Sequence, residues 1–208
     1  MNKEYYILEG DDKRGPFTFN ELIGMDIDIH TEILLPFAEA PVYASELPEF
    51  NAYFEAQGIY FPTGDNLAGY GSRIFAFIID YILISAIVGL IDIRSGLIVL
   101  PAEPKFILPY PASMILVGTF SATFLLYNTI FELTKWKGSL GKIMCRLIVV
   151  DIDGKRLKVV NALVRNLGVL ISLMIYALPF LTVFFNEHRQ AWYDKITKSY
   201  IVTKGNKF

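Results

Sequence analysis

Three long apolar segments follow one another after residue 70. Residues 74–91 read IFAFIIDYILISAIVGLI and contain one charged residue, Asp80. Residues 106–131 contain no charged residue, and residues 166–186 form the third apolar segment. The first two segments are long enough to cross a hydrocarbon core as helices. We expect the second helix to run from about residue 112 to 133, because its prolines suit the start of a helix better than the interior.

The third apolar segment carries Pro179 in its interior and basic residues on both sides. Lys and Arg favour the cytoplasmic side of a membrane, so a single straight span would separate two basic groups that prefer the same side. Two half-helices that enter the membrane and return would keep both groups on one side. About 20 apolar residues also suffice for one span, and the sequence leaves both interpretations open. The flanking basic residues are Lys135, Lys137, Lys142, Arg146, Lys155, Arg156, Lys158 and Arg165 before the segment and Arg189, Lys195, Lys198, Lys204 and Lys207 after it.

The first 50 residues have the character of a small soluble domain. Short strand-like runs such as YYIL and TEILL alternate with turns rich in Gly, Pro and Asp. Thr18 followed by Glu21 is the sequence of a capping box and predicts a helix near residues 19–24. The predicted fold class is therefore a small α+β soluble domain followed by a mainly α-helical membrane domain. The expected divisions are the soluble module at 1–50, a linker at 51–70 and the transmembrane domain at 71–208.

Short strands are also predicted between and after the apolar segments. Residues 141–160 read GKIMCRLIVVDIDGKRLKVV, in which Asp153-Gly154 separates two apolar runs and predicts a β-hairpin. The run SYIVT at 199–203 is a further strand. We expect these strands to lie together at the cytoplasmic surface.

Composition narrows the function classes. Of 208 residues 53% are hydrophobic, including 16 Phe and 12 Tyr, which is too apolar for one ordinary soluble domain. The first 70 residues are acidic and nearly all Lys and Arg come later, so the distribution does not suggest nucleic acid as a partner. Cys145 is the single cysteine and His30 and His188 the two histidines, so no disulfide, zinc site or catalytic triad is expected. We expect no enzyme activity, no cofactor and no metal.

Asp80 and Arg73 are the first candidate site residues. A carboxylate within a spanning helix costs about 2.5–3.5 kcal/mol on insertion scales, so its presence needs a reason. Arg73 lies seven residues earlier, which places both side chains on nearly the same helix face, about 10 Å apart along the axis. The pair handles a proton or cation, or it locks this helix against neighbours such as Arg165 or Arg189.

The motifs of the membrane domain resemble those of the RDD family of bacterial membrane proteins. AGYGSRIFAFIIDYILI matches the family's opening, with Arg73 and Asp80 as its Arg and first Asp. GSLGK resembles its Gly-x-x-Gly-Lys element, with Gly138, Gly141 and Lys142, and this run lacks the spacing of a phosphate-binding loop. NALVRN and HRQAWYDKITKSYIVTK resemble its later elements, which add Arg165, Arg189 and the second aspartate, Asp194.

The first 50 residues resemble GYF-like modules fused to bacterial membrane proteins. The resemblance is carried by a pattern of aromatic, turn and strand residues. True GYF domains bind proline-rich peptides on an aromatic patch, which implies peptide contact by Tyr5, Tyr6, Phe17 and Tyr43. The other interpretation is that these four rings form the core of a tiny domain. The matching positions are Tyr5, Tyr6, Gly15, Pro16, Phe17, Leu22, Thr31 and Tyr43.

Two functional hypotheses follow. In the first, the protein moves a cation or proton, or assists such transport, through Asp80 with Arg73. The resemblance to the RDD family implies this possibility, because cation/proton exchange has been suggested for one member. This hypothesis expects a homo-oligomer, because so few helices rarely enclose a path alone. In the second, the protein is a membrane-anchored adaptor whose N-terminal module recruits a protein partner. Both place the chain as a multi-pass protein in the lipid bilayer of the bacterial cytoplasmic (inner) membrane, with the N-terminal module in the cytoplasm.

Overall fold

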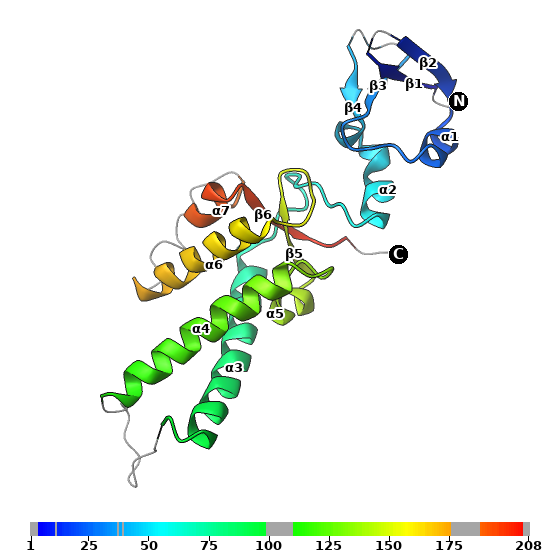
Figure 1. Cartoon of the computed structure of the whole chain (residues 1–208). Coiled ribbons are helices and arrows are strands. Elements are labelled where there is room, and N and C mark those ends of the chain that lie inside the picture. Colours follow the sequence, from blue (N-terminus) through cyan, green and yellow to red (C-terminus); the bar gives the residue numbers. More distant parts are fainter. Residues whose placement is uncertain are drawn as a thin grey trace. The chain divides into compact units, whose positions relative to one another are not determined.

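The computed structural model describes residues 4–10, 12–36, 38, 40–98, 110–175 and 188–205 (Figure 1). The chain forms two compact units, Met1–Phe61 with Asp153–Lys155, and Pro62–Ile152 with Arg156–Phe208. The boundary between Phe61 and Pro62 lies inside the predicted linker.

A four-stranded antiparallel sheet forms the centre of the N-terminal unit. Its strand order is β2-β1-β3-β4. Two short α-helices and two 3₁₀ helices complete the unit. Their bounds are β1 Tyr5–Glu9, β2 Asp12–Phe17, α1 Phe19–Gly24, β3 Glu32–Leu34, β4 Val42–Tyr43, η1 Ala44–Glu46, η2 Pro48–Phe50 and α2 Asn51–Ala56.

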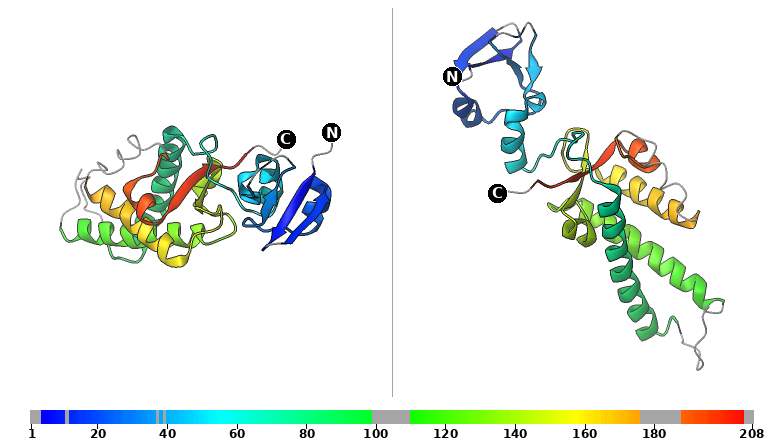
Figure 2. Two further views of the ribbon diagram at one scale, coloured as in Figure 1. Left: turned by 90° about the horizontal axis from the view of Figure 1, so that it is seen from above. Right: turned by 180° about the vertical axis from the view of Figure 1, so that it is seen from behind.

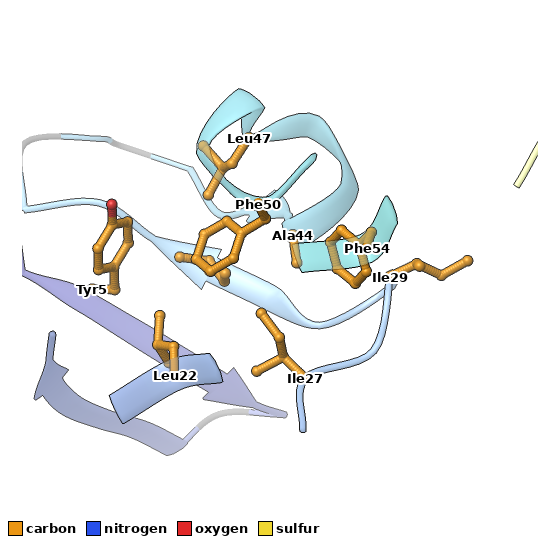
Figure 3. Packing of buried hydrophobic residues seen from close by; sticks show 9 residues of the cluster. Tyr5, Leu22, Ile27, Ile29, Ala44, Leu47, Phe50 and Phe54 are labelled. Carbon is orange, nitrogen blue, oxygen red and sulfur yellow. The ribbon is translucent and has the colours of Figure 1, made fainter. Parts of the chain in front are cut away.

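The core of this unit reaches beyond residue 50. Phe50 and Phe54 are fully buried against Leu22 of α1 and Tyr5 of β1, as Figure 3 shows. Residues 51–56 were expected to begin a linker, but they form α2 because Phe54 is needed to close this small core. A domain of this size has little apolar area to bury, so each aromatic ring contributes a large share.

The capping box predicted for α1 is confirmed. The Thr18 hydroxyl accepts a hydrogen bond from the Glu21 backbone amide at 3.4 Å, and the Thr18 amide donates to Glu21 Oε2 at 2.7 Å. Hydrogen bonds from Thr18 lower the pKa of Glu21. The helix therefore begins where local sequence dictates.

Two long antiparallel helices dominate the second unit, with α6 lying along α4 (Figures 1 and 2). Short helices α5 and α7 pack on α3 and α6 respectively. The predicted second helix, 112–133, is confirmed within one residue. The bounds are α3 Tyr70–Arg94, α4 Ala112–Glu132, α5 Leu140–Met144, β5 Leu147–Asp151, α6 Val159–Met174, α7 Trp192–Ile196 and β6 Ser199–Thr203.

The outer faces of α3 and α4 are apolar, whereas polar side chains lie on their inner faces. Phe75 and Leu90 of α3 are each 66% exposed, and Met114 and Leu126 of α4 are also exposed. Asp80 of α3, by contrast, is buried. Both helices are long and apolar enough to cross a membrane. In a water-soluble bundle the outer faces are polar and the inner faces apolar. The opposite arrangement of α3 and α4 suits helices that are surrounded by hydrocarbon.

The second unit contains a two-stranded sheet, but it is not the predicted hairpin. β5 pairs antiparallel with β6, with Leu147 opposite Thr203 and Asp151 opposite Ser199. The expected partner strand after Gly154 is helical instead, because Val159 begins α6. The prediction that SYIVT would lie with the other strand is confirmed, and the hairpin is wrong. Helical periodicity in VVNALVRNL outweighed the local turn signal of Asp-Gly.

Two close approaches between elements should tolerate no side chain. An added Cβ at Gly141 would collide with the Ala76 carbonyl of α3, and one at Gly168 of α6 would collide with Tyr193 Cβ. We predict that Gly141→Ala and Gly168→Ala each lower the free energy of unfolding by about 1–3 kcal/mol. Thermal unfolding of the purified protein in detergent measures this.

Gly89→Ala in α3 and Gly118→Ala in α4 are matched controls, because nothing lies within 4 Å of a Cβ added there. Both controls should leave stability unchanged or raise it by up to about 1 kcal/mol. Equal effects at all four glycines would contradict these packing contacts.

Candidate functional site

Glu132, the last residue of α4, is fully buried between two cations. Its Oε1 accepts hydrogen bonds from Lys142 Nζ at 2.6 Å and from Arg165 Nη1 at 2.5 Å. Its Oε2 accepts from Asn166 Nδ2 at 3.1 Å. Sequence reasoning missed Glu132, because an acid directly after an apolar segment is typical of an exit into water. Lys142 of the Gly-x-x-Gly-Lys motif, which the structure pairs with Glu132, was the nearest signal in the sequence.

Arg165 of α6 joins Glu132 to Asp194. Its side chain is 2% exposed. Nε donates a hydrogen bond to Asp194 Oδ1 at 2.8 Å, and Nη1 forms the ion pair with Glu132 Oε1. A guanidinium presents several donors in a fixed plane, so one arginine can hold two carboxylates at once. α4, α6 and α7 are therefore joined by a single side chain.

Asp194 is the third residue of α7 and fixes the start of that helix. Its Oδ2 accepts from the Ala191 amide at 3.2 Å, and Ser199 Oγ lies 3.4 Å from Oδ1. Arg73 Nη1 lies 3.9 Å from Oδ2. Burial, and then the negative charge of Asp194, raise the pKa of the neighbouring Tyr193. The predicted second aspartate thus connects α3, α6, α7 and β6.

Asp80 has a different kind of surrounding. Its Oδ1 accepts from Tyr127 OH at 3.0 Å and from the Gly141 amide at 2.8 Å, and its Oδ2 accepts from Ser139 Oγ. Ser139 is the N-cap residue of α5. The carboxylate therefore joins α3 to α4 and to the start of α5 through neutral donors.

Arg73 and Asp80 do not pair with each other, although they were expected to act together. Arg73 lies by Asp194, and its Nη2 donates to the Ile201 carbonyl of β6 at 3.4 Å. Arg189, another predicted member, donates instead to the Leu67 carbonyl at 3.0 Å. Seven residues of separation along α3 let each side chain meet a different element.

The Gly138-to-Lys142 loop fits closely against its neighbours. Because Gly141 has no side chain, the α3 backbone can approach it closely. The Gly141 amide donates a hydrogen bond to Asp80. A Cβ at Gly138 would lie 3.2 Å from the Leu147 carbonyl. Lys142 points to Glu132 and lies 3.5 Å from Asn128 Oδ1. The loop therefore positions one cation and one amide for two buried acids.

The network as a whole is electrically balanced. Three acids, Asp80, Glu132 and Asp194, lie with three bases, Arg73, Lys142 and Arg165. Each oxygen of the three carboxylates accepts at least one hydrogen bond. Buried charges persist at low cost only when they are paired or hydrogen-bonded. Among the described residues, Arg73 Nε is the buried side-chain atom without a hydrogen-bond partner. The arrangement is suited to holding six elements together: α3, α4, α5, α6, α7 and β6.

The four aromatic residues proposed for peptide contact divide between two faces of the N-terminal sheet. Tyr5 is buried and its hydroxyl donates to Glu49 Oε1 at 2.8 Å; burial raises the pKa of Tyr5 to about 12. Phe17 also packs against the core. Tyr43 is 43% exposed, and Tyr6 follows Tyr5 in β1 and so faces the opposite side. The core interpretation holds for Tyr5 and Phe17.

Among the residues that the structure describes, no group of three or more His, Cys, Asp or Glu side chains could hold a metal ion. The carboxylate oxygens of Asp80, Glu132 and Asp194 accept hydrogen bonds from protein donors instead.

Comparison with protein-family models matches residues 67–198 to the RDD family. Neither the curated proteins nor the solved structures that were searched gave a significant match. The family match begins after the N-terminal unit, so the resemblance of that unit to GYF-like modules stays a prediction.

The double ion pair of Arg165 should dominate the stability of the network. We predict that Arg165→Met costs about 3–5 kcal/mol, because it leaves buried carboxylates without their shared cation. Arg165→Lys should restore little, since one ammonium cannot reach both acids in the guanidinium geometry. Thermal unfolding in detergent measures both.

A double-mutant cycle isolates the interaction. Glu132→Gln with Arg165→Met removes one acid and one base together, so the double variant should be less destabilised than the sum of the single variants by at least about 1 kcal/mol. Arg94→Met, at the exposed end of α3, is the matched control and should change little. Strictly additive costs would contradict the pairing.

Proposed function

The chain belongs to the RDD family of membrane proteins, and from this premise we propose that it is a membrane-anchored adaptor. The RDD domain fixes the chain in the bilayer, and the N-terminal unit recruits a protein partner. The observation that carries this proposal is the division of the aromatic residues in the N-terminal unit, which leaves Tyr6 and Tyr43 on an outward face. The balanced network supplies a rigid base for the anchor.

Insertion in a bilayer is supported by the exposure of α3 and α4. The two helices have 25 and 21 residues, and only 22% and 17% of their apolar windows are buried. A core helix of a soluble protein would be mostly buried. Trp136, just after α4, is exposed beside Lys135, as expected for a residue at the membrane interface.

The pairing of β5 with β6 favours a re-entrant third segment. β5 precedes α6 and β6 follows α7, yet the strands are hydrogen-bonded partners. A two-stranded sheet with open edges does not occur within hydrocarbon, so both strands lie on one side of the membrane. The chain between Val159 and Gln190 then enters and returns on that side. α6, with 16 residues, spans about 24 Å, less than a bilayer core. Pro179 lies outside the described residues.

The distribution of basic residues supports a cytoplasmic location for this side. They follow α4 and surround the two-stranded sheet, and Lys and Arg concentrate on the cytoplasmic face of membrane proteins. With two spans before the sheet, the N-terminal unit lies on the same side. The proposed location is the bacterial cytoplasmic membrane.

Single-cysteine labelling tests this topology in a Cys145→Ser background. In intact cells an impermeant maleimide should label Ser95→Cys, between the two spans. It should not label Gly64→Cys or Gly205→Cys until the cells are permeabilised. External labelling of Gly205→Cys would show that the third segment crosses the membrane and would overturn re-entry.

The outward sheet face of the N-terminal unit provides the binding surface. Leu8, Glu32 and Tyr43 are neighbours across three strands, because Leu8 pairs with Glu32 and Glu32 with Tyr43. The Lys13 ammonium lies 3.9 Å from the centre of the Tyr6 ring. An aromatic face with charges of both signs suits an extended peptide with apolar or proline side chains.

Site-specific photo-crosslinking in cells tests recruitment. A photoreactive residue at Tyr43 should form an adduct with a defined protein, and Tyr6→Ser should lower its yield about tenfold, as the loss of about 1.4 kcal/mol of binding would. The same photoreactive residue at Met25, the exposed residue directly after α1, is the matched control and should give no such adduct. Absence of an adduct at Tyr43, or a yield unchanged by Tyr6→Ser, would contradict the adaptor.

Transport through Asp80 is the second candidate, favoured by its burial on a spanning helix with neutral donors only. Apolar side chains of Ile84, Val88 and Phe124 pack beyond it, so a path would need a second copy of the chain. Cation-driven flux in proteoliposomes that Asp80→Asn abolishes would favour transport over recruitment.

A further inference from the structure

The outward face of the N-terminal sheet carries an acid among apolar side chains. Ile33 of β3 is buried in the core, so Glu32 and Leu34 on either side of it point to the opposite face. Glu32 is paired with Leu8 of β1 on one side and with Tyr43 of β4 on the other. Leu8 and Leu34 are half-buried and do not belong to the apolar core of the unit. The face therefore presents one carboxylate framed by two leucines and an aromatic ring.

The Glu32 carboxylate has no partner within the chain. Glu32 is half-buried, and its side chain forms no hydrogen bond or ion pair among the residues that the structure describes. Glu9 on the same sheet is different, because its Oε1 accepts a hydrogen bond from Arg14 Nη1 at 3.2 Å. The acid at the centre of the face is therefore available to a cation from another molecule.

Tyr43 places an aromatic ring directly beside this acid. Side chains that lie opposite each other on antiparallel strands have Cβ atoms about 4.5–5.5 Å apart, and Glu32 and Tyr43 are such a pair. The Tyr43 side chain is exposed, and its ring meets His30 edge-on with the ring centres 5.9 Å apart. A guanidinium can stack on an aromatic ring and donate two parallel hydrogen bonds to a carboxylate. The juxtaposed acid and ring therefore suit arginine.

The Tyr6 ring on the same face already holds a cation of the chain itself. The Lys13 ammonium lies 3.9 Å from the centre of that ring. No cation of the described part of the chain lies over the Tyr43 ring. Of the two aromatic positions on this face, Tyr43 is thus the one that a cation from a partner can use.

The charge of the N-terminal unit favours a basic partner. Residues 1–61 contain twelve acidic and three basic residues. Such a strongly negative unit repels nucleic acid and anionic lipid headgroups, and it attracts a positively charged segment. The occupant that complements this face is therefore a basic segment of a protein.

We propose that the outward sheet face binds an arginine in an extended basic segment of a partner protein. The guanidinium pairs with the Glu32 carboxylate and stacks on the Tyr43 ring, and the apolar stem of the arginine and its neighbours contact Leu8 and Leu34. This inference rests on the proposed adaptor function and gives the chemistry of the partner. Lysine fits less well, because its ammonium has no plane to stack and no paired donors for a carboxylate.

Peptide libraries test the site on the full chain in nanodiscs of phosphatidylcholine, a lipid without net charge that does not concentrate basic peptides. One library of short random peptides has arginine fixed at its centre, and two matched libraries have lysine or citrulline there. Citrulline has the shape of arginine without its charge. The wild type should retain the arginine library about tenfold more than the citrulline library, because the charged hydrogen bonds to Glu32 are lost with citrulline. Retention of the lysine library should lie between the two.

Variants of the two central side chains assign this preference to the site. Glu32→Gln should abolish the preference for arginine over citrulline. Tyr43→Leu should lower it about threefold, and Tyr43→Phe, which keeps the ring, should preserve it. Glu9→Gln is the matched control, because it removes the same charge from the neighbouring strand on the other side of the sheet. This control should leave the preference unchanged.

Equal retention of the arginine and citrulline libraries by the wild type would overturn the arginine site. Equal losses in Glu32→Gln and Glu9→Gln would also overturn it, since they would show a general effect of charge. Should Glu32→Gln fail to fold, the wild-type comparison and the two Tyr43 variants decide. A crosslinked partner at Tyr43 in cells, together with equal retention of the libraries, would leave recruitment standing and overturn the arginine site alone.

Discussion

The two ion pairs of Arg165 are the interaction on which the base of the RDD domain depends. The guanidinium lies between Glu132 at the end of α4 and Asp194 in α7, and the other two bases of the network each contact one of these acids. Lys142 adds α5 through Glu132, and Arg73 adds α3 through Asp194. These ion pairs lie beside two buried apolar clusters, one around Ile84 and Phe124 and one around Leu147 and Val149, so the domain is held by charge pairs and by apolar packing together.

Such a centre is consistent with the surroundings proposed for the helices. In a bilayer the outer surface of a helix gains nothing from turning inward, since lipid is as apolar as a protein core. Side chains such as Phe75 and Leu90 remain outside, and specific contacts between helices must come from polar groups and close backbone approaches. The Gly141 and Gly168 contacts provide the latter.

Sequence patterns predicted the features that depend on a single segment. The length and polarity of α3 and α4 follow from uninterrupted apolar runs, and the start of α1 follows from Thr18 and Glu21 alone. The partners of the buried charges could not be predicted in this way, because spacing along α3 says nothing about which element approaches each turn. Glu132 was missed for a related reason: it stands at the edge of an apolar run, where acids are usually hydrated.

The pairing of β5 with β6 has a consequence for biosynthesis. Glu132, Lys142 and Arg165 are all synthesised before Asp194 and the strand that follows it. While the nascent chain is still short of β6, β5 has no partner strand and Arg165 has one acid instead of two. The base of the domain thus closes late, after both long helices have been synthesised, and until then β5 presents an unpaired strand edge, which is a template for pairing with another chain.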